Sequence, residues 1–216
     1  MIRVAALVLV LLVPSSAVAS DPFTTRSETP IGVNEEGKLF VAIDQQVVGT
    51  ETTFKPVAYL APRGKKPRGI RIRSYKVDTK DAETEARTKE RADKVRLGND
   101  GAFEKAGVVE ATPIIGGGTG RYRIPVLGLK IYLEDNQILA EVGGIIDRRT
   151  VTLVKGLEKL TKRCKGTRTN EILHVVARPE WKSAAIYVQA KCEPEAEEAP
   201  GTRIRKLHVL DLSSLE

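Results

Sequence analysis

The 216-residue sequence has little of several residue types that functional sites are commonly built from. It contains two cysteines, two histidines and one tryptophan. His174 and His208 each stand alone, without the glutamate or second histidine one helical turn away that a zinc site uses, and two cysteines cannot complete such a site. No Gly-x-Ser-x-Gly sequence offers a nucleophile for acyl transfer. The sequence therefore predicts no catalytic residue, no metal ion and no cofactor, and we expect both histidines to be core or edge residues of strands.

Long hydrophobic runs are missing except at the start of the chain, where Val4 to Val13 is unbroken. This run follows Arg3 and ends before a small-residue sequence, Ala17-Val18-Ala19. A charged head, a short apolar middle and a small-residue exit are typical of a secretory signal peptide. The alternative, a membrane anchor, would need about 20 apolar residues. We therefore predict a signal peptide at residues 1–19, a periplasmic or secreted mature chain, and no membrane span after cleavage.

The two cysteines, Cys164 and Cys192, would both lie in the exported part of the chain. An even number of cysteines outside the reducing cytosol predicts a disulfide, with a pair of free buried thiols as the alternative. A bond closing this loop would stabilise the fold by roughly 3–4 kcal/mol.

Positive charge is concentrated in one stretch that contains no acidic residue. Its seven cations are Arg63, Lys65, Lys66, Arg68, Arg71, Arg73 and Lys76. Period-two alternation over residues 70–77 predicts a strand with Arg71 and Arg73 on one face. Such a patch suits a phosphate, an acidic glycan or an acidic protein. The alternative is a charged edge strand that resists pairing with other chains. Export and the 5% aromatic content argue against a nucleic-acid partner.

The order of patterns predicts a mixed α/β (α+β) fold with two small layered domains. Residues 20–36 are polar, with proline and glycine, and are expected to form a flexible lead-in. The first domain is expected at residues 37–115 and the second at 124–216, joined by a glycine-rich linker at 116–123. No helical pattern follows these glycines, so they predict a linker or turn and not a phosphate-binding loop.

The second domain is expected to run strand, strand, helix, strand, helix, strand. Apolar residues at helical spacing predict its two helices. These residues are Leu153, Leu157, Leu160 and Cys164, then Trp181, Ala185, Val188 and Cys192. If the helices pack in parallel on the sheet, their C-terminal cysteines meet, which supports the disulfide. The first domain repeats this order more weakly, with a largely solvated helix over 79–97, and the repetition predicts an internal duplication.

This element order, with its lengths, resembles the periplasmic domain of the TolR and ExbD biopolymer-transport family. The match covers a hairpin at 131–138, helices at 149–164 and 180–192, and strands at 172–179 and 207–212, with residues 38–114 as a degenerate second copy. The resemblance implies helices packed on a sheet, and binding and dimerisation on the envelope side. Family members have an N-terminal membrane anchor with an acidic residue, whereas the N-terminal apolar run here is short and uncharged and is expected to be removed. A proton-coupled role is therefore not implied, and no site residue is carried over.

Two function hypotheses follow from these observations. The first is an exported, non-enzymatic cell-envelope protein with a binding or scaffolding role, whose partner is an envelope protein or an anionic cell-wall polymer. The second is a small exported enzyme whose site residues come together only in the fold. A deep pocket converging on His174 or His208 with carboxylates would favour the enzyme. A flat basic face and two similar subdomains would favour the binding protein.

Overall fold

The computed structural model describes residues 25–114, 121–125, 128–144, 146–162, 164–193, 195 and 202–213. The predicted signal peptide at 1–19 lies outside these residues, as do positions 116–120 of the predicted linker. Within the described ranges, no helix combines the length and the apolar character that crossing a bilayer requires.

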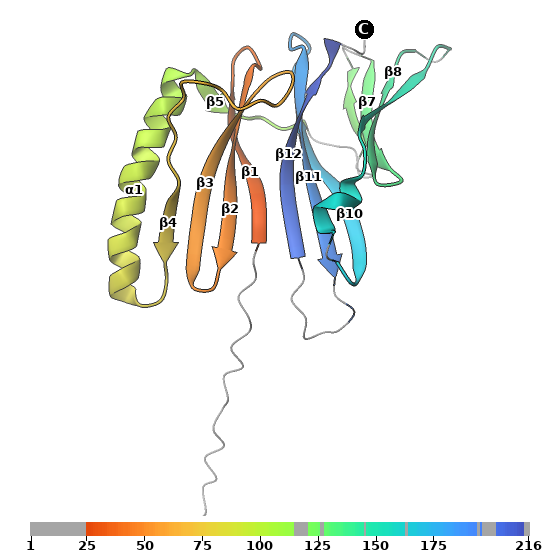
Figure 1. Ribbon diagram of the computed structural model, residues 1–216. Helices are drawn as coiled ribbons and strands as arrows, with labels where there is room; N and C mark the ends of the chain where they lie inside the picture. The colour runs from red at the N-terminus through yellow and green to blue at the C-terminus, as the bar shows by residue number, and fades with distance from the viewer. Residues whose placement is uncertain are drawn as a thin grey trace, which may run out of the picture.

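A large mixed sheet forms the centre of the molecule (Figure 1). The strand order is β10-β11-β12-β1-β2-β3-β4. Every neighbouring pair in this order is antiparallel except β1 and β12, which are parallel. A short strand, β5, pairs with β1 beside this path. The strands are β1 (Thr25–Asn34), β2 (Leu39–Val48), β3 (Glu51–Leu60), β4 (Tyr75–Asp78), β5 (Val108–Glu110), β10 (Thr167–Val176), β11 (Ser183–Glu193) and β12 (Thr202–Asp211).

A second, four-stranded antiparallel sheet packs against the β10–β12 end of the large sheet. It consists of β6 (Tyr122–Ile124), β7 (Leu129–Glu134), β8 (Gln137–Val142) and β9 (Arg149–Val154), followed by a 3-10 turn, η2 (Leu157–Thr161). Asp135 and Asn136 both have positive φ and join β7 to β8, as a two-residue hairpin turn requires. The predicted strands and turn of this hairpin are confirmed.

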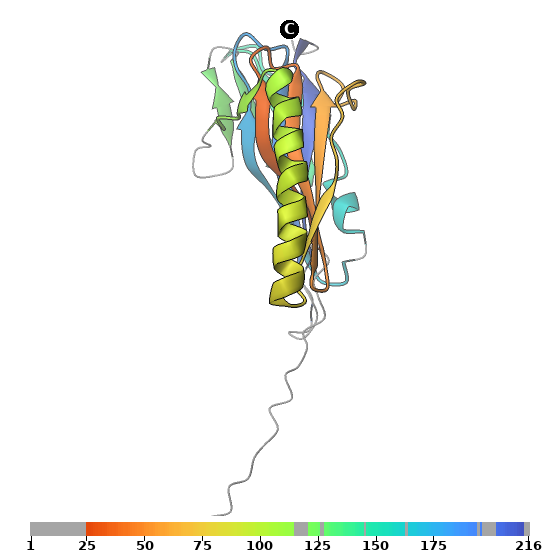
Figure 2. The ribbon, with the colours of Figure 1, turned by 90° about the vertical axis from the view of Figure 1, so that its left-hand side faces the viewer.

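One helix, α1 (Ala82–Lys105), runs along the β4 edge of the large sheet (Figure 2). It begins at Asp81, whose side chain accepts a hydrogen bond from the Thr84 backbone N–H. Three of its residues are buried, namely Ala92, Asn99 and Phe103. The predicted solvated helix is confirmed, and it extends beyond its expected end.

Apolar side chains occupy both faces of the large sheet. Ile186 and Val188 of β11 face the small sheet, where they pack with Ile131 and Ile138. Tyr187, the residue between them, packs on the opposite face with Trp181 and other buried side chains. Successive strand residues point to opposite faces, so β11 is covered on both sides. All eight residues from 183 to 190 are buried.

The two helices predicted for the second half are wrong. Residues 149–154 form strand β9, and Gly156 adopts a left-handed conformation (φ 66°) that starts the 3-10 turn. Residues 183–193 form strand β11. β9 forms a strand because Thr150, Val151 and Thr152 are β-branched and favour extended structure. In β11 burial on both faces removes the alternation by which a strand is recognised.

The chain also does not separate into the two predicted domains, because both halves contribute to one sheet. β1 pairs with β12 through Arg26↔Ile204 and Ser27↔Arg205. Residues 25–34, expected in a flexible lead-in, form β1 at the centre of this sheet. Helix α1 has no counterpart among the residues described after position 120, which argues against the duplication. The coarse class, mixed α/β, is confirmed.

Candidate functional site

The seven predicted cations lie in the connection between β3 and β4 and at the start of β4. We call residues 63–76 the basic strip. All seven cationic side chains are exposed. The strand within it is shorter than predicted, because only residues 75–78 pair with β3. Residues 66–74 precede that strand without forming one.

The basic strip is held against the protein by contacts on its inner side. Ile70 and Ile72 pack against the core cluster that contains Phe103 of α1. Asn99, 3% exposed, hydrogen-bonds the Arg73 backbone twice: its Oδ1 accepts from the Arg73 N–H and its Nδ2 donates to the Arg73 carbonyl, both at 2.9 Å. The Asn99 amide thereby supplies hydrogen-bond partners to the backbone N–H and carbonyl of Arg73, as a neighbouring strand would. The cations alternating with the two isoleucines are therefore directed to solvent.

Acidic side chains lie near the two ends of the strip. At one end, Lys76 forms an ion pair with Glu51, and this hydrogen bond raises the Lys76 pKa. At the other end, the pKa of Asp211 is lowered by hydrogen bonds from Ser213 and, less strongly, by Arg63. In the part of the chain that the structure describes, none of the remaining five cations forms an ion pair: Lys65, Lys66, Arg68, Arg71 and Arg73.

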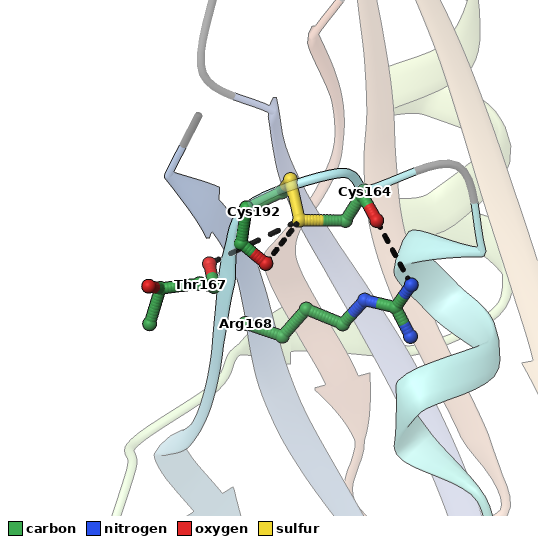
Figure 3. The surroundings of a disulfide bond; sticks show 5 residues. Cys164, Thr167, Arg168 and Cys192 are labelled. Atoms are coloured by element: carbon green, nitrogen blue, oxygen red, sulfur yellow. Dashed lines mark hydrogen bonds between the residues drawn. A yellow bond between two sulfur atoms is a disulfide. The ribbon is translucent and has the colours of Figure 1, made fainter. Parts of the chain in front are cut away.

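The predicted disulfide between Cys164 and Cys192 is present, with 5.6 Å between the Cα atoms (Figure 3). Its setting differs from the prediction, because Cys164 follows η2 and Cys192 lies on β11. Arg168 of β10 pairs with Cys192 and donates a hydrogen bond of 2.9 Å to the Cys164 carbonyl. The disulfide thus links the segment that follows η2 to strand β11 of the large sheet. A disulfide favours an oxidising location outside the cytoplasm.

The two histidines lie on opposite faces of the large sheet. His174 packs against the Tyr187 ring, with 4.3 Å between the centroids, whereas His208 pairs with Ile186 on the other face. Burial, helped by Lys206, lowers the His208 pKa to about 4, and its Nε2 lies buried without a hydrogen-bond partner. The two rings cannot act on one substrate. Within the described ranges, no cluster of three or more His, Cys, Asp or Glu side chains could hold a metal ion.

A buried carboxylate that the sequence did not reveal lies where β1 and β12 part. Glu28, 4% exposed, accepts hydrogen bonds from the Tyr59 hydroxyl (2.7 Å) and the Leu207 N–H (2.5 Å). Burial, and Glu28 as a smaller cause, raise the pKa of the Tyr187 hydroxyl above its ordinary value. Because the carboxylate takes the place of a strand partner for Leu207, we assign it a structural role. Recognising β1 as a strand would have placed Glu28 on the buried face beside Asp44, its neighbour in β2.

No protein-family model, no curated protein and no solved structure matches this chain. Nothing in these comparisons links it to the TolR and ExbD proteins, and the two helices that the resemblance required are a strand with a 3-10 turn and a second strand.

Proposed function

We propose that this protein is an exported, non-enzymatic binding protein of the cell envelope, and that its basic strip binds an anionic polymer. The observation that carries the proposal is the set of five exposed cations that form no ion pair among the described residues. Asn99 and the partly buried Ile70 and Ile72 hold the backbone around Arg71 and Arg73. Cations fixed before binding lose less conformational entropy on contact than cations on a mobile loop.

A linear polyanion suits the shape of the strip better than a single small anion does. Arg68, Arg71 and Arg73 follow one another along chain that rises at most ~3.3 Å per residue, so their backbone positions span up to about 17 Å. A polymer with regularly spaced phosphate or carboxylate groups can contact all three at once. Each contact is exposed and worth only ~0.5 kcal/mol, and affinity therefore depends on their number and falls with added salt.

Export is supported by two observations of different kinds. The N-terminal sequence has the three parts of a signal peptide, and the Cys164–Cys192 bond requires an oxidising environment to form and persist. Mass spectrometry of the protein made in its host should find a mature N-terminus at or near Ser20, and an intact Met1 in the membrane fraction would contradict export.

Binding is tested with two purified polyanions, polyglycerol phosphate and polygalacturonate, by biolayer interferometry at low and high salt. The triple variant Arg68→Gln/Arg71→Gln/Arg73→Gln should bind about tenfold more weakly, as three contacts of this size predict. The matched control, Arg87→Gln/Lys89→Gln/Arg91→Gln, removes the same charge from exposed positions of α1 and should stay within about twofold. Equal losses in both variants would show that binding follows net charge alone and would contradict the proposal.

A further variant tests whether the strip must be held in place. Asn99→Ala leaves the charge unchanged but removes both hydrogen bonds to the Arg73 backbone, at a cost of roughly 1–3 kcal/mol of folding free energy. Amide hydrogen exchange should rise at residues 70–74, and polymer affinity should fall about threefold. The control Asn170→Ala, which removes a side-chain hydrogen bond to Asn136 instead, should change neither quantity. Unchanged polymer affinity in Asn99→Ala, with exchange raised as expected, would refute a preorganised strip.

A further inference from the structure

A pocket of about 320 Å³ opens between the turn that joins β6 to β7 and the turn that follows β8. Its charged lining consists of Arg123, Lys130 and Arg148. Lys130 lies between Leu129 and Ile131, whose side chains are buried in the core, so its own side chain points to the outer face of the small sheet. The volume lies at the lower end of the range for small-molecule sites.

The charges around this pocket are unbalanced. Strand register places Arg123 directly opposite Lys130, and Lys130 directly opposite Glu141. The Glu141 carboxylate pairs with both the Lys130 ammonium (3.2 Å) and the Arg148 guanidinium (3.1 Å). Arg123 forms no ion pair with any residue that the structure describes. Like charges directly opposite one another destabilise a sheet, so an anion between Arg123 and Lys130 would remove an unfavourable interaction.

The uncharged part of the lining contains glycines from two turns, together with Pro125 and Leu129. Gly143 has φ 110°, and a Cβ there would lie 2.1 Å from the Asp147 carbonyl oxygen. No other residue fits this turn, and the turn returns the chain so that Arg148 reaches Glu141. A Cβ on Gly128 would lie 3.8 Å from the Gly143 carbonyl oxygen, so the two glycines lie close to one another. The described lining thus combines three cationic side chains with these glycines, Pro125 and Leu129.

We propose that this pocket binds a small anion through a phosphate or carboxylate group. The two guanidinium groups provide planar, paired donors that fit such oxygens, and the Lys130 ammonium adds a third positive group. Glu141 holds Lys130 and Arg148 in position before the anion arrives. The site lies on different strands from the basic strip and does not depend on the function proposed for it.

The test is a titration of the full mature chain followed by amide chemical shifts, with inorganic phosphate, glycerol phosphate and succinate as probes and glycerol as the uncharged control. Saturable shifts should be confined to the turns at 123–130 and 141–148. Arg123→Gln should weaken binding about tenfold, as the loss of one charge-assisted contact predicts. Tighter binding of glycerol phosphate than of inorganic phosphate would assign the site to organic phosphates, and the reverse order to the free ion.

Two further variants separate the pocket from the general positive charge of the surface. Arg71→Gln removes one cation from the basic strip and should leave these shifts unchanged. Gly144→Leu keeps the charge but places a side chain at the pocket, where no heavy atom lies within 4 Å of a Cβ; it should abolish binding while thermal unfolding stays near that of the parent. Absence of saturable shifts, equal weakening by Arg71→Gln and Arg123→Gln, or full affinity in Gly144→Leu would each overturn the proposal.

Discussion

The two ends of the large sheet are stabilised in different ways. At the β10–β12 end, core clusters lie on both faces and residues 183–190 are buried without exception. At the β2–β4 end, α1 covers the sheet edge with three buried residues of its 24. Apolar burial is the main favourable contribution to folding, so most of the stability should lie in the sandwich at the β10–β12 end.

At the α1 end, hydrogen bonds hold parts of the backbone that apolar packing holds elsewhere in the sheet. The Asn99 side chain forms two hydrogen bonds with the Arg73 backbone, as a neighbouring strand would, and Asp81 caps the start of α1. Such contacts fix the backbone while leaving side chains exposed. The proposed binding surface thus lies at the end of the sheet where substitutions on the outside disturb little packing.

The largest difference is expected from matched truncations at the two ends. Ile186, fully buried in β11, lies between the sheets, and Ile186→Ala should lower the free energy of unfolding by about 2–5 kcal/mol. Leu97 on α1 is 65% exposed, and Leu97→Ala should change it by less than about 0.5 kcal/mol. Chemical denaturation of both variants measures the two values. Similar losses would show that stability does not differ between the ends.

The disulfide should have the next largest effect. Replacing both Cys164 and Cys192 by serine should lower the free energy of unfolding by about 3 kcal/mol, because the unfolded chain regains the freedom of the closed loop. The melting temperature of the parent should fall on reduction to that of the double variant. Alkylation of the denatured, unreduced protein should label neither cysteine, and two labelled thiols would refute the bond.

The smallest of the three effects depends on pH. His208 has a pKa near 4 in the folded chain against 6.5 for an unperturbed group, so the unfolded state binds the proton more readily. Stability should therefore fall as the pH is lowered from 6.5 to about 4, by roughly 2–3 kcal/mol from this residue.

His208→Gln should make stability less sensitive to acid over this interval. His174→Gln should act in the same direction, because burial, and to a smaller extent Arg205, also lower the His174 pKa. Denaturation curves at several pH values measure both effects, and an acid sensitivity unchanged in His208→Gln would show that this histidine is not buried uncharged.

The sequence predicted elements well where one face meets water. The hairpin at 129–142 and the solvated helix follow from alternation, turn residues and composition. It failed where burial is complete, where pairing is long-range, and in β9, whose β-branched residues form a strand despite the helical spacing of apolar residues from Leu153 onward. In β11 both faces are buried, so its sequence lacks the alternation of polar and apolar residues that identifies a strand. β1 is rich in polar residues and is a strand because β2 and β12 flank it.

The candidate sites show the same division. The basic strip could be found from sequence because its cations lie within 14 residues that contain no acidic residue, and the cysteine pair because only one pairing exists. The predicted disulfide is present, but the two helices that were expected to bring its cysteines together are not, and export stays a prediction. The pocket could not be found, because Arg123, Lys130 and Arg148 meet only through the register of two hairpins.

The pairing of β1 with β12 has a consequence for how the chain reaches its folded state. Glu28 and Leu207, which meet at this seam, are 179 positions apart in the chain. Contacts between such distant segments raise the contact order and slow folding. During synthesis β1 can pair with β2 and β5, but its pairing with β12 must wait until this last described strand has been made. The central seam of the sheet therefore closes late in folding.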